Sequence, residues 1–110
     1  MPTLPELLKI TVDREGSDLH ISTSSPPQVR IHGHLERLAM PELSPSDTKQ
    51  LVYSVLTGSQ KKRFEETMEL DFSFGIKGLA RFRCTVFNQR GALAAGYRLL
   101  SAEIRRFGEV

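Results

Sequence analysis

Hydrophobic and polar residues alternate with a period of two from residue 81 to residue 86 in a segment that continues to residue 89, and after Gly91 a second apolar run extends to residue 100. This pattern predicts two antiparallel strands joined by a two-residue turn at positions 90 and 91. That turn fixes the register of the hairpin. The pairs predicted for its buried face are Phe82 with Leu99, Cys84 with Tyr97, and Val86 with Ala95. The opposite face pairs Arg83 with Arg98.

The predicted pairing of Arg83 with Arg98 places two guanidinium groups side by side on a sheet. Like charges directly opposite each other on a ladder are destabilising unless something anionic lies between them. The hairpin alone therefore suggests an anion site, with a solvated basic edge as the alternative. On the other face, Cys84 is expected to be a buried, inert thiol.

The remaining pattern predicts a helix, three short strands, two more helices and a further strand before the hairpin. Leucines at roughly helical spacing, with Thr3 as the cap and Pro5 in the first turn, predict the N-terminal helix, which ends at Gly16. Period-two segments predict strands at residues 17–22 and 28–32, a third through Leu35 and Leu38, and a fourth at residues 70–74.

The two central helices are predicted at about residues 46–56, capped by Ser44 or Ser46, and at about residues 59–68. Phe64 and Met68, four positions apart, are expected on the buried side of the second helix. Short connections between neighbouring strands imply an antiparallel sheet with helices on one face. We therefore predict a single α+β domain over residues 1–110 with the order α-βββ-αα-βββ.

The net charge of +2 is distributed unevenly along the chain. Residues 1–79 carry nine Lys or Arg and eleven acidic residues, whereas residues 80–110 carry six Arg, no Lys and two acidic residues. Arginine favours planar, bidentate contacts to phosphate or carboxylate. The sequence has neither an apolar run long enough to span a bilayer nor a secretory signal pattern, so we expect a cytoplasmic protein.

The sequence lacks the motifs of metal binding, of hydrolase activity and of nucleotide binding. His20, His32 and His34 include one local His-x-His pair but no further ligands at metal-binding spacing, so we expect no metal site. Ser17 lacks the context of a hydrolase nucleophile. The chain has no phosphate-binding glycine motif, so we expect no cofactor bound by this domain alone and no enzymatic activity of its own. It does offer arginines on a rigid sheet that could clamp an anion bound by another domain.

Four motifs, in order along the chain, resemble the amino-terminal domain of the PilT-type twitching-motility ATPases, the retraction motors of type IV pili within the secretion ATPase superfamily. They are SDLHIS at residues 17–22, PPQVRI at 26–31 with Gly33 after it, LDFSF at 70–74, and ARFRCTVFNQRG at 80–91. The resemblance covers essentially the whole chain. It implies a PAS-like fold of about six strands.

The resemblance also implies a functional setting. A RecA-like ATPase domain is expected after residue 110, binding ATP and Mg and assembling into a homo-hexamer, so that this domain packs on the ATPase domains of its own and the neighbouring subunit. Arg83 and Arg98, with Arg81 as a weaker candidate, match the family's arginines that reach the nucleotide phosphates in trans. In this chain alone, Arg83 and Arg98 are then expected to form an exposed, unfilled pair. The pilus inner-membrane platform protein is a further expected partner, which implies a peripheral location at the inner membrane.

Two other functions are compatible with the residues. The arginine-rich sheet face, with Phe87 as a stacking platform, could bind single-stranded nucleic acid, although the modest net charge leads us to expect no direct nucleic-acid partner. A PAS-like fold could also enclose a small molecule as a sensor. The bulky residues expected to fill the core instead are Phe72, Phe74, Phe82, Tyr97 and Leu99.

Overall fold

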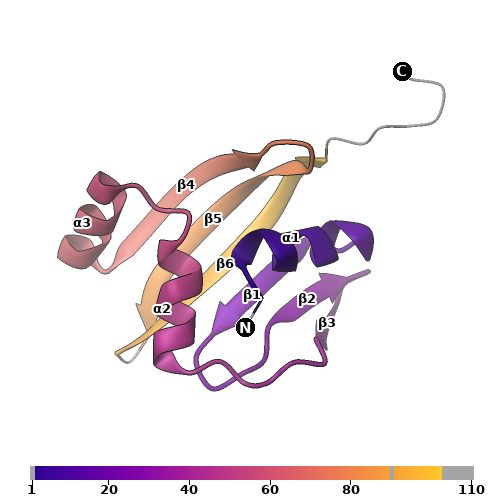
Figure 1. Ribbon diagram of the computed structural model, residues 1–110, viewed down its shortest axis with the longest axis horizontal. Helices are drawn as coiled ribbons and strands as arrows, with labels where there is room; N and C mark the ends of the chain where they lie inside the picture. The colour runs from indigo at the N-terminus through magenta and orange to yellow at the C-terminus, as the bar shows by residue number, and fades with distance from the viewer. Residues whose placement is uncertain (1, 90, 103–110) are drawn as a thin grey trace.

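The computed structural model describes residues 2–89 and 91–102, which form one six-stranded antiparallel sheet and three helices (Figure 1). The helices are α1 (Leu4–Asp13), α2 (Pro45–Tyr53) and α3 (Gly58–Thr67). The strands are β1 (Asp18–Ser22), β2 (Gln28–Ile31), β3 (His34–Arg37), β4 (Glu69–Ile76), β5 (Ala80–Gln89) and β6 (Ala92–Ala102). This order confirms the predicted α+β class and the α-βββ-αα-βββ arrangement.

Each helix begins with a capping box. The side chain of Thr3, Ser44 or Thr57 accepts a hydrogen bond from the backbone N–H three residues later, and the side chain at that later position accepts one from the cap residue's own N–H. These reciprocal bonds satisfy N–H groups that the first turn of a helix leaves unpaired. The predicted cap at Thr3 is confirmed, and Ser44 rather than Ser46 caps α2.

The end of α3 differs from the prediction at Met68. This residue adopts the left-handed conformation, with φ of 64°, and its N–H bonds to the carbonyl of Phe64 as the helix stops. Phe64 is buried as expected, but Met68 is 53% exposed. The left-handed backbone takes the Met68 side chain off the helical stripe that spacing alone assigned to it.

The hairpin of β5 and β6 has the predicted register. The facing pairs are Phe82 with Leu99, Cys84 with Tyr97, Val86 with Ala95, and Arg83 with Arg98. The ladder extends to Gln89 opposite Ala92, and a register shift follows between Arg81 and Phe82. Residue 90 of the turn lies outside the described residues. The prediction succeeded because the turn length and the alternation of one local segment determine this register.

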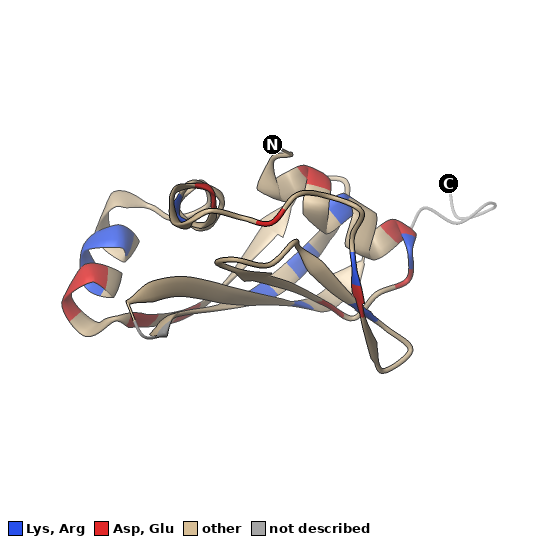
Figure 2. Cartoon of the chain, turned by 90° about the horizontal axis from the view of Figure 1, so that it is seen from below, with Lys and Arg blue, Asp and Glu red and all other residues tan. Residues whose placement is uncertain are grey.

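All three helices lie on one side of the sheet, and none of the described helices lies on the other side (Figure 2). The core between the helices and the sheet includes Phe64, Phe82 and Tyr97, each no more than 2% exposed. Phe72, Phe74 and Leu99, which we expected to fill the core, are only partly buried at its margin. Bulky side chains therefore occupy the core, and no helix of the described residues covers the opposite face of the sheet.

Cys84 lies on the core side of β5 with no exposed surface. Burial raises the pKa of its thiol to about 12. The side chain thus behaves as the buried thiol that the alternating pattern predicted.

Candidate functional site

The uncovered face of the sheet carries charged residues on adjacent strands at matching positions. Asp18 on β1 is paired with Arg30 on β2 and with Arg98 on β6, and Arg98 is in turn paired with Arg83 on β5. Since paired residues project from the same face, these four side chains form a row across the middle of the sheet. We call this face the open face.

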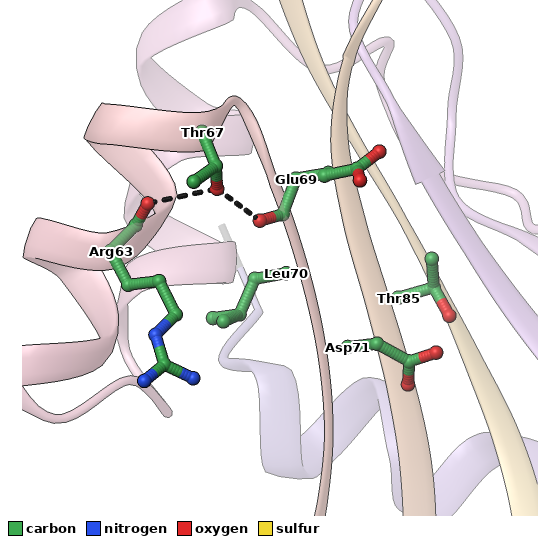
Figure 3. Close-up of a pocket in the computed structure, with 6 residues that line it drawn as sticks. All are labelled: Arg63, Thr67, Glu69, Leu70, Asp71 and Thr85. Carbon is green, nitrogen blue, oxygen red and sulfur yellow. Dashed lines mark hydrogen bonds between the residues drawn. The ribbon is translucent and has the colours of Figure 1, made fainter.

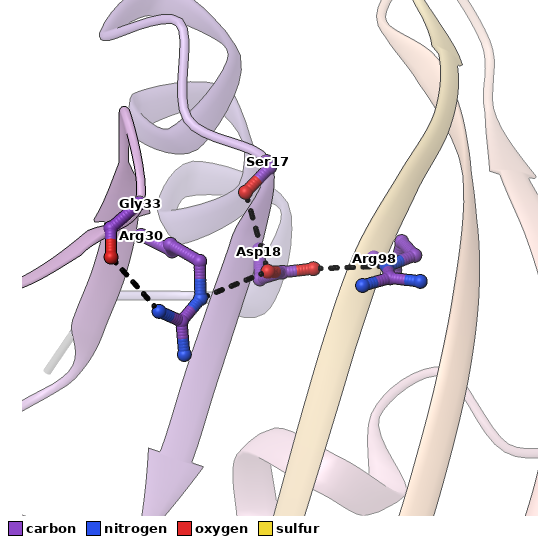
Figure 4. A network of polar contacts seen from close by, with 5 residues as sticks. All are labelled: Ser17, Asp18, Arg30, Gly33 and Arg98. Atoms are coloured by element: carbon purple, nitrogen blue, oxygen red, sulfur yellow. Dashed lines mark hydrogen bonds and ion pairs between the residues drawn. The ribbon is translucent and has the colours of Figure 1, made fainter.

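Asp18 binds an arginine on each side (Figure 4). Its Oδ1 accepts from Nε of Arg98 at 3.3 Å, and its Oδ2 lies 3.3 Å from Nε of Arg30. Ser17 Oγ donates to the same Oδ2 at 3.2 Å, while Arg30 also donates to the carbonyl oxygen of Gly33. The Asp18 side chain is 12% exposed, whereas that of Arg98 is 72% exposed. The carboxylate is therefore fixed in the sheet, and the guanidinium of Arg98 reaches into solvent.

Arg83 binds a different carboxylate, that of Asp71 on β4. Nε and Nη2 of Arg83 donate to the two carboxylate oxygens at 3.1 and 2.8 Å. These hydrogen bonds lower the pKa of Asp71 and raise that of Arg83. The side chains are 60% and 48% exposed, so this bidentate pair lies at the surface.

The expectation of an unfilled arginine pair is therefore wrong in one respect. Arg83 and Arg98 are exposed and directly paired, but each forms an ion pair with a carboxylate on its other side. The repulsion between two facing cations is relieved by Asp71 and Asp18 rather than by an anion between the arginines. Sequence reasoning missed both carboxylates as parts of the site, although each occupies a polar position of a period-two strand.

A hollow of about 250 Å³ lies on the open face beside these arginines. The residues that line it are Asp18, His20, Arg83, Thr85, Gly96, Tyr97 and Arg98. It contains two of the three predicted site residues. Arg81, the third, is absent from this lining, and its side chain lies close over Gly75 on β4, where a Cβ atom would come within 3.0 Å of Nη1.

A second hollow of about 380 Å³ lies between α3 and β4 (Figure 3). Arg63, Glu69 and Asp71 are its charged lining residues. The hydroxyl of Thr67 is already engaged there with the backbone carbonyl oxygens of Arg63 and Glu69. With two acidic residues and one basic residue, this hollow is a poorer anion site than the one on the open face.

The three histidines belong to two strands and a turn. His20 is on β1, His34 begins β3, and His32 lies in the turn before it with φ of 49°. Within residues 2–89 and 91–102, no group of three or more His, Cys, Asp or Glu side chains is arranged to hold a metal ion. None of the described helices is long and apolar enough to cross a membrane.

Comparison with known proteins identifies several relatives, although no protein-family profile matches the chain. The type IV pilus retraction ATPase PilT of Pseudomonas aeruginosa is 36% identical over 107 residues, which are 97% of this chain and 31% of PilT. The type IV pilus ATPase PilU of the same organism is 30% identical over 105 residues, or 96% of this chain and 28% of PilU.

Solved structures show the same relationship. A crystal structure of the pilus retraction motor PilT with bound ADP matches with a TM-score of 0.86 and 40% identity, over all of this chain and 32% of that chain. The ATPase DotB of Legionella pneumophila matches with a TM-score of 0.75 at 18% identity, over 90% of this chain and 29% of DotB, which shows a shared fold. The chain thus spans about a third of the length of the curated relatives it matches. The sequence and the fold agree that this chain corresponds to the amino-terminal portion of a PilT-type twitching-motility ATPase.

Proposed function

We propose that this domain packs, through the open face, on the ATPase domain of a neighbouring subunit and supplies Arg83 and Arg98 to the nucleotide phosphates bound there. The observation that carries the proposal is the direct pairing of these two arginines beside a hollow on a face that no described helix covers. Two cations fixed on a sheet can stabilise the charge of a transferring phosphoryl group without reorganising.

The proposed setting is a homo-hexamer of the whole protein. The RecA-like ATPase domain would bind ATP and Mg, since this chain has no phosphate-binding loop. The described residues provide cations for phosphate but no cluster of acidic ligands for a metal ion. The domain would then be catalytically silent alone, and the assembled motor would act on the pilus at the inner membrane through the platform protein.

Asp71 and Asp18 give the two arginines different roles in this proposal. Arg83 forms an ion pair with Asp71 in which both side chains are exposed. Arg98 is bound by the carboxylate of Asp18, which is 12% exposed and is shared with Arg30. An incoming phosphate can displace Asp71 from Arg83 while Asp71 moves into water. It can approach Arg98 without breaking the Asp18 bond, because Asp18 engages only Nε of that guanidinium in the described network.

The test uses the full-length protein with Arg83→Ala and Arg98→Ala, measuring ATP affinity and turnover. We expect turnover to fall on the order of a hundredfold in each variant, comparable to the loss of one preorganised donor at a transition state. Arg81→Ala should have a smaller effect because its side chain lies over Gly75 rather than at the hollow.

Arg14→Ala is a matched control, since it also removes an exposed arginine from an ion pair, that with Glu36 at 3.3 Å. Its turnover should remain near wild type. Unchanged ATP affinity and unchanged turnover in both Arg83→Ala and Arg98→Ala would refute the assignment of these arginines.

The two alternative functions are less well supported. Phe87 is 39% exposed and is the one Phe, Tyr or Trp side chain that the described strands place on the open face. Proteins that bind single-stranded nucleic acid use several aromatic side chains, on which successive bases stack. A small-molecule sensor would need space in the core, where Phe64, Phe82 and Tyr97 are packed.

A further inference from the structure

We propose that His20 is a further ligand for the phosphate group bound beside Arg83 and Arg98, donating a hydrogen bond from Nδ1 of its neutral imidazole ring. This inference rests on the proposed function and extends it to a residue outside the arginine set. His20 lies two residues after Asp18 on β1 and therefore projects from the same open face.

The sheet register places His20 at the hollow. It is paired with Gly96 on β6 and with Gln28 on β2, and it lines the same 250 Å³ hollow as the two arginines. A Cβ atom at Gly96 would lie 3.9 Å from His20 Nδ1, and no other heavy atom outside the adjacent residues would be as close. The Nδ1 edge of the ring thus faces a position where the sheet has no side chain.

The hydrogen bonding of His20 is incomplete in this structure. Nε2 is fully enclosed and has no partner, and no described residue forms a hydrogen bond to the ring. Among backbone groups, an enclosed N–H without an acceptor is rarer than an enclosed carbonyl without a donor, and we apply the same preference to the ring nitrogens. The tautomer with its proton on Nδ1 is therefore favoured, because it avoids an unpaired N–H group at Nε2 and presents a donor at the hollow.

The surroundings of His20 also favour the neutral ring. Burial lowers its pKa, and the positive charge of Arg30 lowers it further, while Asp18 opposes both effects. The other charged groups at this hollow are Arg83 and Arg98. Above neutral pH, the ring can thus donate one hydrogen bond without adding a third positive charge beside the arginines.

The lining of the hollow indicates the chemical class of the ligand. Arg83 and Arg98 both line it, and guanidinium groups bind phosphate oxygens through charge-assisted hydrogen bonds. We therefore assign the hollow to the phosphate groups of a nucleotide.

The experiment titrates inorganic diphosphate into this chain at pH 8 and low salt, following backbone amide signals by NMR. His20→Asn places an amide nitrogen near the position of Nδ1, whereas His20→Gln places it near that of Nε2. We expect His20→Asn to bind diphosphate within about threefold of wild type and His20→Gln to bind on the order of tenfold more weakly, the effect of one hydrogen bond to a charged group. His34→Gln, on the exposed strand β3, is the matched control and should bind as wild type does.

The NMR signals of the histidine rings test the role of His20, and the turnover of the full-length protein tests the proposed function separately. In the wild-type chain, diphosphate should shift the Nδ1 signal of His20 but not those of His32 or His34, which tests the inference even if a substitution at position 20 prevents folding. Wild-type affinity in His20→Gln, an unmoved Nδ1 signal, or no diphosphate binding at all would each overturn the role of His20. The proposed function fails separately, when turnover of the full-length protein is unaffected by both arginine substitutions.

Discussion

Arg83 and Arg98 occupy directly paired positions on β5 and β6, and each guanidinium group is bound to a carboxylate on the strand farther from the other arginine. Asp71 on β4 and Asp18 on β1 thus each balance the charge of one of the two cations that the hairpin places in paired positions. The consequence is that both arginines are charge-balanced in the absence of an anion, and the proposed site still presents two guanidinium groups to a phosphate.

The Arg83–Asp71 bond can be tested by titration. Because hydrogen bonds from Arg83 lower the pKa of Asp71, this carboxyl group should titrate below the ordinary value of 3.8. At pH values above the unfolded-state pKa of Asp71, the Arg83–Asp71 pair stabilises the fold. This stabilisation is lost as the pH falls through the lower pKa of Asp71 in the folded state. Carbon NMR of the Asp71 carboxyl group should report these values.

Arg83→Ala should return the pKa of Asp71 toward its ordinary value. Glu6, whose pKa is lowered by hydrogen bonds with Thr3 at the start of α1, serves as the internal reference and should titrate identically in both proteins. An Asp71 pKa that stays low after Arg83→Ala would show that another group causes the shift.

Asp18 should contribute more to stability than an exposed carboxylate does. Asp18→Ala leaves Arg30 and Arg98 without the carboxylate that they share, so we expect the free energy of unfolding to fall by about 1–3 kcal/mol. Urea denaturation measures this change. Asp13→Ala is the control, because it breaks the exposed Lys9–Asp13 pair and should cost no more than about 0.5 kcal/mol. Equal losses in the two variants would contradict a structural role for Asp18.

Cys84 should be unreactive in the folded protein. With a pKa of about 12, only roughly one thiol in ten thousand is ionised at pH 8, and the side chain has no exposed surface. A thiol reagent such as Ellman's reagent should modify Cys84 only as fast as the protein unfolds, and fully in denaturant. Rapid labelling of the native chain would mean that β5 opens locally.

Gly16 and Gly96 should respond differently to the same substitution. A Cβ at Gly16 would lie 2.6 Å from Cγ1 of Val29, and Gly16→Ala should therefore destabilise the fold by about 1–3 kcal/mol. Gly96→Ala should stay within about 0.5 kcal/mol of wild type, since its nearest contact would be an ordinary 3.9 Å. Thermal denaturation of both variants compares them, and similar melting temperatures would contradict the close approach at Gly16.

Contacts between residues close together in the sequence could be predicted, whereas contacts between residues far apart in the sequence could not. Local signals sufficed for the hairpin register and for the cap at Thr3. The position of Asp18 beside Arg98 follows from the pairing of β1 with β6, which brings together residues eighty positions apart. No local pattern specifies that partner, so the sequence predicted the pairing of the two arginines but not the carboxylates that bind them.

The prediction for Met68, at the end of α3, failed for a different reason. Periodicity placed Met68 on the buried stripe of α3, but the chain leaves the helical conformation at this residue. The helical spacing of Phe64 and Met68 carries no information about the backbone angle at Met68. The exposed side chain of Met68 therefore became apparent only in the structure.

The strand order β3-β2-β1-β6-β5-β4 divides the sheet into two halves that are each formed by chain neighbours and that meet only where β1 pairs with β6. Since β6 follows the other five described strands along the chain, the two halves of the sheet cannot pair until β6 has been synthesised. A growing chain on the ribosome would carry β1 and β5 with unpaired edges until residue 102 emerges, and such edges are prone to pair with other chains. The segment that supplies Arg98 to the open face is therefore also the segment that joins the two halves of the described sheet.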